Sequence, residues 1–119
     1  MTDQTENPKD ANYNRALIIV ESVQFKHRYP SEAKKANGRI EKAIEIAAAG
    51  HVKSPASRNN SHIYMVVSQS DEKYYLVDPI QKSCTCPDAS EKHMLCKHRL
   101  AVAFSQAFIT NPPEWLKQS

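Results

Sequence analysis

The cysteines of this 119-residue chain are confined to one short stretch, which constrains the fold more than any other feature. The order is Cys84-Thr-Cys86, a spacer from Pro87 to Leu95, and then Cys96-Lys-His98. Thiolate sulfur and imidazole nitrogen are preferred zinc ligands, and a structural zinc site closes with four of them in a tetrahedron. The four residues therefore predict one structural zinc ion bound by Cys84, Cys86, Cys96 and His98.

The spacing of these residues also constrains the local fold. Residues i and i+2 of an extended chain point to the same side, so Cys84 and Cys86 can reach one ion from the end of a hairpin. The same spacing diverges on a helix, so we expect Cys96 just before a helix and His98 in its first turn. A ββα unit of roughly 45 residues is near the size at which metals or disulfides become necessary. Structural zinc contributes about 10–16 kcal/mol in such peptides.

Other interpretations of the cluster remain open at this point. The cysteines could lie together by accident as small buried residues, or His93 could replace His98 as the fourth ligand. A redox pair is disfavoured because thioredoxin-like sites use a Cys-x-x-Cys spacing. A catalytic zinc would need an open coordination position and a base, and no HxE or HExxH motif frames Glu91 in the spacer. We therefore expect no enzymatic activity and no small-molecule substrate.

The N-terminal sequence and the apolar runs indicate a cytoplasmic protein without membrane contact. The first ten residues lack the basic start and apolar segment of a secretory signal. No apolar run, including that from Ala16 to Val20, is long enough to cross a bilayer. In a reducing compartment, clustered cysteines more often bind metal or act in catalysis than form disulfides. Three cysteines would in any case leave one thiol unpaired.

Charge and glycine content narrow the function classes further. The net charge of +3 is compatible with a nucleic-acid partner without requiring one. The two glycines, Gly38 and Gly50, belong to no phosphate-binding loop or dinucleotide fingerprint.

We expect a small α+β protein, with two N-terminal helices followed by a zinc-stapled ββα finger. Composition and periodicity divide the chain into five consecutive parts. They are a flexible tail (1–12), a helical arm (13–50), a loop (51–61), the finger (62–110) and a C-terminal tail (111–119).

Two helices are expected in the arm. Ala16, Ile19, Val20 and Val23 have the spacing of one apolar helix face, although the run from Leu17 is also compatible with a strand. Pro30 ends this segment. The second helix would begin with Ser31 as N-cap and end before Gly50. Its apolar stripe comprises Ala33, Ala36, Ile40, Ala43, Ile44 and Ala47.

Two strands and a last helix are expected in the finger. Residues 63–68 and 74–78 alternate β-branched and aromatic positions, and the polar residues 70–73 between them predict a hairpin. The final helix is predicted from one apolar face and ends at Asn111-Pro112-Pro113. That face comprises Leu100, Ala103, Phe104, Ala107 and Phe108.

These motifs together closely resemble the SWIM-type zinc finger, which is defined by CxC, a variable spacer and CxH. The resemblance covers about Ile63 to Phe108, and the helix ending in Ala-Ala-Ala-Gly resembles the arm that precedes this finger in many bacterial members. It rests on Tyr75-Leu76-Val77-Asp78, Cys84-Thr85-Cys86-Pro87-Asp88, Cys96-Lys97-His98 and Ala101-Val102-Ala103.

The resemblance implies a ββα zinc fold and a role in binding DNA or other proteins. SWIM fingers occur beside transposases, helicase-like ATPases and recombination factors. Since no ATPase or nuclease domain accompanies the finger in this chain, no enzymatic activity is implied. The four zinc ligands are the positions that correspond to the family motif.

Nucleic-acid binding, with DNA as the expected target, is the function that we favour for an accessory protein of this kind. Cations near a helix start can contact phosphates, and tyrosines can stack on unpaired bases. These cations could equally form an ordinary solvated surface and the tyrosines part of the core. The candidates are Lys82, Lys92, Lys97 and Arg99, then His51, Lys53 and Arg58, with Tyr64, Tyr74 and Tyr75 for stacking.

The alternative function is a protein–protein interaction adaptor within a larger DNA-processing complex. The alanine-rich stripe between Ser31 and Ala49 would let another helix approach closely. Trp115, after a double proline, could be an interface residue, since tryptophan is enriched at interface hot spots. It could equally fold back onto its own core.

Overall fold

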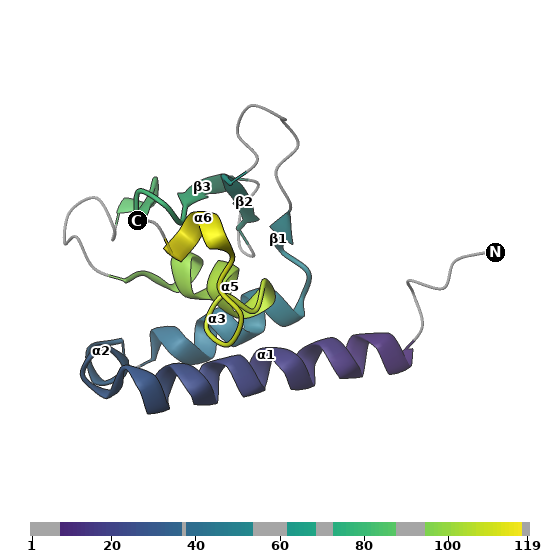
Figure 1. Ribbon diagram of the computed structural model, residues 1–119. Helices are drawn as coiled ribbons and strands as arrows, with labels where there is room; N and C mark the ends of the chain where they lie inside the picture. Colours follow the sequence, from purple (N-terminus) through teal and green to yellow (C-terminus); the bar gives the residue numbers. More distant parts are fainter. Residues whose placement is uncertain (1–7, 37, 54–61, 69–72, 88–94, 118–119) are drawn as a thin grey trace.

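The fold is described from a computed structural model, which places residues 8–36, 38–53, 62–68, 73–87 and 95–117 (Figure 1). Three layers are visible: the long helix α1 (Pro8–Arg28), then α3 (Arg39–Ala48) with α5 (Lys97–Ser105), then an antiparallel sheet. The short helices α2 (Pro30–Lys35) and α6 (Glu114–Lys117) lie at the margins. The small α+β class expected from the sequence is confirmed.

Helix α1 presents a different face to the core from the one that its periodicity predicts. The buried residues are Ile18, Glu21, Ser22 and Phe25, on the side that contacts α3 and α5. The predicted apolar face lies in solvent, with Ile19, Val20 and Val23 each 42–53% exposed. The prediction failed because glutamate and serine are normally surface residues, whereas Glu21 and Ser22 are buried here. The hydroxyl of Ser22 donates a hydrogen bond to the carbonyl of Ile19, and the carboxylate of Glu21 accepts one from a distant turn.

The ends of α1 are set by proline. The helix begins at Pro8, so its first turns include residues that the sequence assigns to the flexible tail. Proline is well tolerated at the first helical position, where its missing N–H has no partner to lose. The helix ends at Arg28, shortly before Pro30, with basic residues in its last turn.

The second predicted helix is divided into α2 and α3. Gly38 adopts a φ of 84°, which a left-handed turn requires and which interrupts the helix. Tyr29, rather than the predicted Ser31, occupies the N-cap of α2, because Pro30 takes the first helical position. The remainder is as expected: Ala36, Ile40, Ala43 and Ala47 are buried, and Gly50 follows the helix with a φ of 77°.

The sheet has four antiparallel strands in the order β1-β2-β3-β4: Val52–Lys53, Tyr64–Val67, Tyr74–Asp78 and Ser83–Cys84. The predicted hairpin is confirmed as β2 and β3, which pair Tyr64 with Val77 and Val67 with Tyr74. Strand β1 was not predicted, and it places Lys53 in the sheet rather than in the loop. A strand of two residues is too short to show an alternating pattern in the sequence. Its pairing also depends on residues that lie far along the chain.

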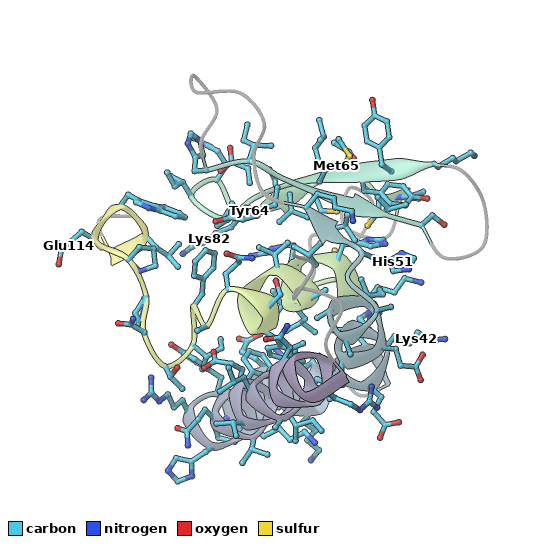
Figure 2. All side chains as sticks on the ribbon, turned by 90° about the vertical axis from the view of Figure 1, so that its right-hand side faces the viewer. Lys42, His51, Tyr64, Met65, Lys82 and Glu114 are labelled. Atoms are coloured by element: carbon cyan, nitrogen blue, oxygen red, sulfur yellow. The ribbon has the colours of Figure 1, made fainter. Side chains whose placement is uncertain are left out.

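The core lies where α5 packs between the helices and the sheet. Val66 and Val77 point inward from the sheet onto Leu100, Ala101 and Phe104. Viewed along α1, the side chains fill the space beneath the sheet, while Met65 lies on its outer face (Figure 2). Among the described residues, no helix is both long and apolar enough to span a membrane.

Helix α5 ends at Ser105, earlier than the predicted face through Phe108. Ala107 has a φ of 59°, and the N–H of Phe108 bonds to the carbonyl of Ala103 at 2.9 Å. This is a Schellman motif, in which alanine takes the left-handed position that glycine usually occupies. Phe108 thereby turns toward the sheet and makes an edge contact with Tyr64.

The turn after α5 is held to α1 by a buried carboxylate. Glu21, only 4% exposed, accepts hydrogen bonds from the N–H of Ile109 at 3.0 Å and from the N–H and hydroxyl of Thr110. Nη1 of Arg28 donates to the carbonyl of Ile109 at 2.5 Å. These bonds connect the N-terminal helix to the end of the finger.

Candidate metal centre

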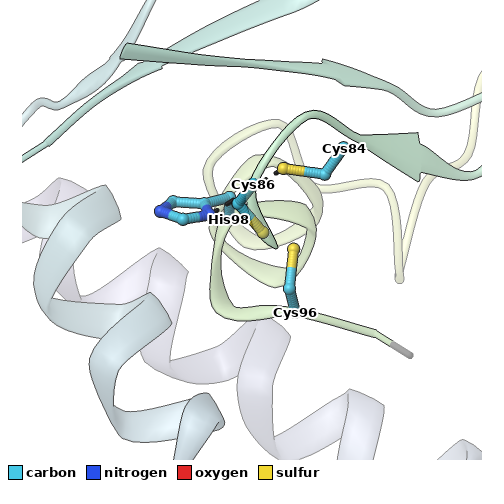
Figure 3. A group of neighbouring side chains, drawn as sticks. All are labelled: Cys84, Cys86, Cys96 and His98. Atoms are coloured by element: carbon cyan, nitrogen blue, oxygen red, sulfur yellow. Dashed lines mark hydrogen bonds between the residues drawn. The ribbon is translucent and has the colours of Figure 1, made fainter. Parts of the chain in front are cut away.

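The three cysteines and His98 meet in one buried cluster (Figure 3). Their ligand atoms lie within 4.8 Å of one another, and Sγ of Cys84 is 3.8 Å from Nδ1 of His98. The cysteines form no disulfide. Three thiols and one imidazole that converge in a buried space can hold a metal ion, as the sequence predicts.

Two of the cysteines are positioned by the edge of the sheet. Cys84 lies on β4 opposite Val77, and Cys86 follows two residues later, so both side chains point inward. Thr85 fixes this segment to β3: its N–H donates to the carbonyl of Leu76 at 3.1 Å. In return, the N–H of Leu76 donates to Oγ1 of Thr85 at 3.0 Å. Thr85 was not singled out from the sequence, because its role depends on a strand pairing.

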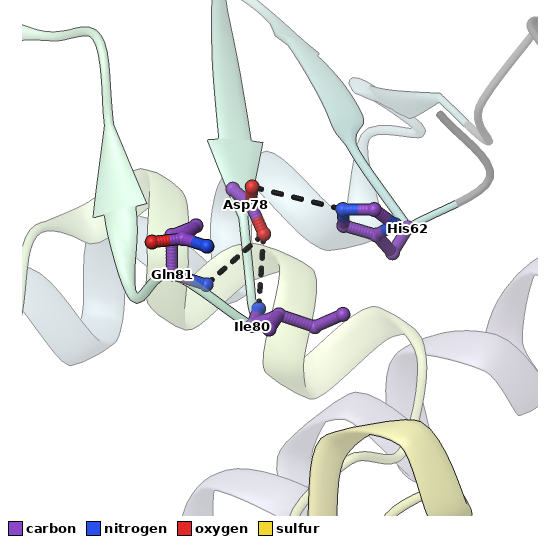
Figure 4. Close-up of polar contacts among 4 residues, drawn as sticks. All are labelled: His62, Asp78, Ile80 and Gln81. Atoms are coloured by element: carbon purple, nitrogen blue, oxygen red, sulfur yellow. Dashed lines mark hydrogen bonds and ion pairs between the residues drawn. The ribbon is translucent and has the colours of Figure 1, made fainter. Parts of the chain in front are cut away.

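Asp78 shapes the turn that connects β3 to β4 (Figure 4). Its Oδ1 accepts hydrogen bonds from the N–H groups of Ile80 and Gln81 at 3.0 and 3.1 Å, and Oδ2 lies 3.7 Å from Nε2 of His62. Lys82 then takes a left-handed φ of 57°, which directs the chain into β4. The turn thus sets the direction from which Cys84 enters the cluster.

The other two residues are placed by the start of α5, as expected. Cys96 is the N-cap residue, with extended backbone angles, and its carbonyl accepts the N–H of Leu100 at 3.1 Å. His98 lies in the first turn, and its ring packs against Tyr75 with centroids 4.6 Å apart. Nδ1 faces Cys84 and is therefore the nitrogen directed into the cluster. His93 and Glu91, considered from the sequence, lie outside the described residues.

Contact between two of the thiols shifts their pKa values in opposite directions. The hydrogen bond to Cys96, together with burial, raises the pKa of Cys84. The same bond, with Cys84 as donor, lowers the pKa of Cys96 to about 3. A proton held between two sulfurs is the arrangement that a divalent cation would replace, since metal ligands bind as thiolates.

The predicted nucleic-acid contacts are brought together only in part. Lys82 is exposed on the β3–β4 turn, and Lys97 is half-buried at the start of α5. Arg99 is also half-buried, and desolvation lowers the pKa of its guanidinium while the nearby Cys96 and Cys84 oppose that shift. Lys92 and Arg58 lie outside the described residues. Of the described candidates, Lys82 and Arg99 line one cavity, whereas Lys97 is not among its lining residues.

Several of the remaining candidates from the sequence have structural roles. Tyr64 is buried, Tyr75 covers His98, and Nδ1 of His51 lies 2.9 Å from the carbonyl oxygen of Val67. Tyr74 is 58% exposed and Lys53 is also exposed. Trp115 folds back as part of α6 and makes an edge contact with Phe108, at a centroid distance of 5.5 Å.

A cavity beside the cluster could not be anticipated from the sequence. It has a volume of about 890 Å³ and is bounded by α1, α2 and α3 on one side and by α5 and the β3–β4 turn on the other. Five cations from these separate segments line it, while Glu32 supplies a carboxylate among the described residues. The cationic residues are Arg28, Lys35, Arg39, Lys82 and Arg99.

Comparison with known proteins supports the assignment of the C-terminal half. Residues 66–107 match the family model of the SWIM zinc finger, which confirms the resemblance seen in the sequence. The match includes all four residues of the cluster. No curated protein and no solved structure matches the chain.

Proposed function

We propose that this chain, whose residues 66–107 match the SWIM zinc finger, binds one structural zinc ion through Cys84, Cys86, Cys96 and His98. In a tetrahedron with Zn–S bonds of about 2.3 Å and a Zn–N bond of about 2.0 Å, two sulfurs lie about 3.8 Å apart and a sulfur lies about 3.5 Å from the nitrogen. The 3.8 Å between Sγ of Cys84 and Nδ1 of His98 is within about 0.3 Å of the sulfur–nitrogen value. The donor set of three sulfurs and one imidazole also favours zinc over the oxygen-seeking cations.

The ion would staple β4 and its continuation to the start of α5, giving the zinc-stapled ββα finger expected from the sequence. The two pairs of ligands come from elements on either side of residues 88–94, which lie outside the described structure. Four protein ligands would leave no open coordination position, which supports a structural rather than a catalytic ion. The chain is accordingly proposed to be non-enzymatic, in a compartment that keeps thiols reduced.

We further propose that the protein is an accessory factor that binds nucleic acid, with DNA as the expected target. One observation carries this proposal: positive charge is concentrated on the cavity. Its lining holds five cationic side chains and one carboxylate among the described residues, whereas the whole chain has a net charge of only +3. The remainder of the chain is therefore close to neutral. Phosphate contacts supply most of the non-specific affinity for nucleic acid.

Fluorescence anisotropy of the zinc-loaded protein with labelled DNA tests this function. We expect binding at near-physiological salt, a linear decrease of log K with log salt, and loss of binding after chelation of zinc. Absence of binding at low salt, by protein that is folded and zinc-loaded, would contradict the proposal.

A second function, protein–protein interaction in a DNA-processing complex, is favoured by one surface of the fold. This surface is not one of the two features, the alanine stripe and Trp115, that suggested the function from the sequence. The alanine stripe is largely buried within the fold, and Trp115 is half-buried against Phe108. Instead, α1 exposes four aliphatic side chains on its outer side. These are Leu17, Ile19, Val20 and Val23.

The simplest partner for this stripe is a second copy of α1, because a two-fold axis would match the stripe to itself. Light scattering after size exclusion distinguishes the cases. A dimer that becomes a monomer in Val20→Glu, while Lys26→Glu on the same helix stays dimeric, supports the interaction. A monomeric wild-type protein at high concentration contradicts self-association through this stripe.

A further inference from the structure

The cavity beside the cluster is lined by two kinds of side chain, which differ in both burial and polarity. Its buried members are the apolar side chains of Phe25, Ala36, Val77 and Val102. Its exposed members are mainly cations, among them Arg28, Lys35 and Lys82. An apolar interior with a cationic mouth suits a ligand that combines flat apolar groups with a negatively charged backbone.

The aromatic side chains at the cavity favour a ligand with flat rings. Tyr29 lines the cavity and is 49% exposed, and its ring is supported by Phe25 at a centroid distance of 5.7 Å. Phe25 in turn contacts Phe104 of α5 at 6.0 Å, which anchors the aromatic pair in the core. A half-exposed ring held from behind presents a surface on which an unpaired base can stack.

We infer that this cavity binds a single-stranded segment of nucleic acid, with bases against Tyr29 and the apolar interior and phosphates on the cations of the mouth. The inference rests on the proposed nucleic-acid function and deepens it by assigning strandedness and place. The cavity volume of about 890 Å³ falls within the roughly 300–1,000 Å³ typical of small-ligand sites, so unstacked bases can enter. The bases of a duplex are already paired and stacked, so a duplex would reach only the mouth.

The cations that line the cavity come from separate parts of the fold. Lys35 comes from α2, Arg39 from α3, Lys82 from the β3–β4 turn and Arg99 from α5, so positive charge reaches the cavity from more than one element. Arg28 uses one donor on the carbonyl of Ile109, and a guanidinium has five N–H donors. An acidic peptide would satisfy the same charges, but it would not need the supported aromatic ring.

The experiment compares binding of a labelled oligo-dT strand and of a labelled duplex to full-length zinc-loaded protein. The variant Lys35→Gln/Lys82→Gln removes two exposed cations of the mouth. Its matched control is Lys34→Gln/Lys42→Gln, which removes two exposed lysines outside the cavity. We expect tighter binding of the single strand and an affinity about tenfold lower in the cavity variant. Its log–log salt slope should fall by about 1.4, since each contact with a single strand contributes about 0.7.

The aromatic contribution is measured separately with Tyr29→Ala and Tyr29→Phe. We expect about fivefold weaker single-strand binding for the alanine variant, an unchanged salt slope, and near wild-type affinity for phenylalanine. Circular dichroism and zinc content establish that each variant is folded.

The outcomes separate this inference from the proposed function. If the protein binds DNA but the cavity and control variants weaken it equally, or if duplex is preferred, nucleic-acid binding stands and the cavity assignment is overturned. Displacement of labelled oligo-dT by polyglutamate at lower concentrations than by unlabelled oligo-dT overturns it in favour of an acidic peptide. If wild-type protein binds neither DNA, both proposals fail.

Discussion

The ring of Tyr75 lies against the imidazole of His98, with centroids 4.6 Å apart and planes inclined by 31°. Tyr75 belongs to β3 and His98 to α5, so this contact joins the sheet to the helix next to the cysteine cluster. It restricts the orientation of the ring whose Nδ1 faces Cys84. Residues that orient metal ligands commonly change metal affinity by about 10–100-fold when they are removed.

Replacement of Tyr75 should therefore weaken zinc binding without removing a ligand. We expect Tyr75→Ala to lower zinc affinity about tenfold and Tyr75→Phe to retain it, because the ring face rather than the hydroxyl contacts His98. Competition with a chromogenic chelator measures the affinities. Tyr74→Ala, one residue away and exposed, is the control; equal losses in Tyr74→Ala and Tyr75→Ala would contradict the role assigned to Tyr75.

Thr85 provides a second test of how the cluster is positioned. Thr85→Val removes the acceptor for the N–H of Leu76, and we expect it to cost about 0.5–1 kcal/mol in unfolding free energy, since the bond is exposed. Thr85→Ser keeps the hydroxyl and should lie close to wild type. Urea denaturation of the zinc-loaded protein gives both values. A valine variant as stable as the serine variant would show that the hydroxyl bond contributes nothing.

Sequence and structure agree where local chemistry determines the outcome. The convergence of the four cluster residues, the β2–β3 hairpin and the helix end before Gly50 follow from short-range spacing and turn chemistry. The position of Cys96 before α5 also follows, because the CxH spacing had to begin a helix. These features depend on residues that are near one another in the chain.

The differences arise where distant segments determine which side of an element is buried. On α1 the pattern of Ile19, Val20 and Val23 predicts the wrong face, because Glu21 becomes buried only through bonds to Thr110. No local signal identifies that partner. The cavity was missed for the same reason, since its cations come from helices and turns that only the tertiary fold brings together.

The buried carboxylate of Glu21 should be important for stability. Glu21→Ala leaves the N–H groups of Ile109 and Thr110 without their acceptor, and we expect a loss of about 2–3 kcal/mol in unfolding free energy. Thermal or urea unfolding measures this loss. Glu45→Ala, on an exposed position of α3, should stay within about 0.5 kcal/mol of wild type. A Glu21 variant as stable as the Glu45 control would contradict the assigned link between α1 and the turn after α5.

Ala107 offers a change that should stabilise the protein. An alanine at a φ of 59° carries the steric cost of the left-handed conformation, which glycine avoids. We expect Ala107→Gly to raise the unfolding free energy by about 0.5–1 kcal/mol, after the entropic cost of glycine is deducted. Gly50→Ala, at a φ of 77°, is the reciprocal variant and should destabilise the protein. Destabilisation by Ala107→Gly would contradict the cap geometry.

The proposed zinc ion joins β4 to α5 through three sulfurs and one imidazole. X-ray absorption at the zinc edge of the purified protein, together with the metal content of the same sample, measures this coordination. We expect one zinc per chain, with a shell of three sulfurs at about 2.3 Å and one nitrogen at about 2.0 Å. Absence of zinc, or a shell made only of oxygen and nitrogen, would contradict it.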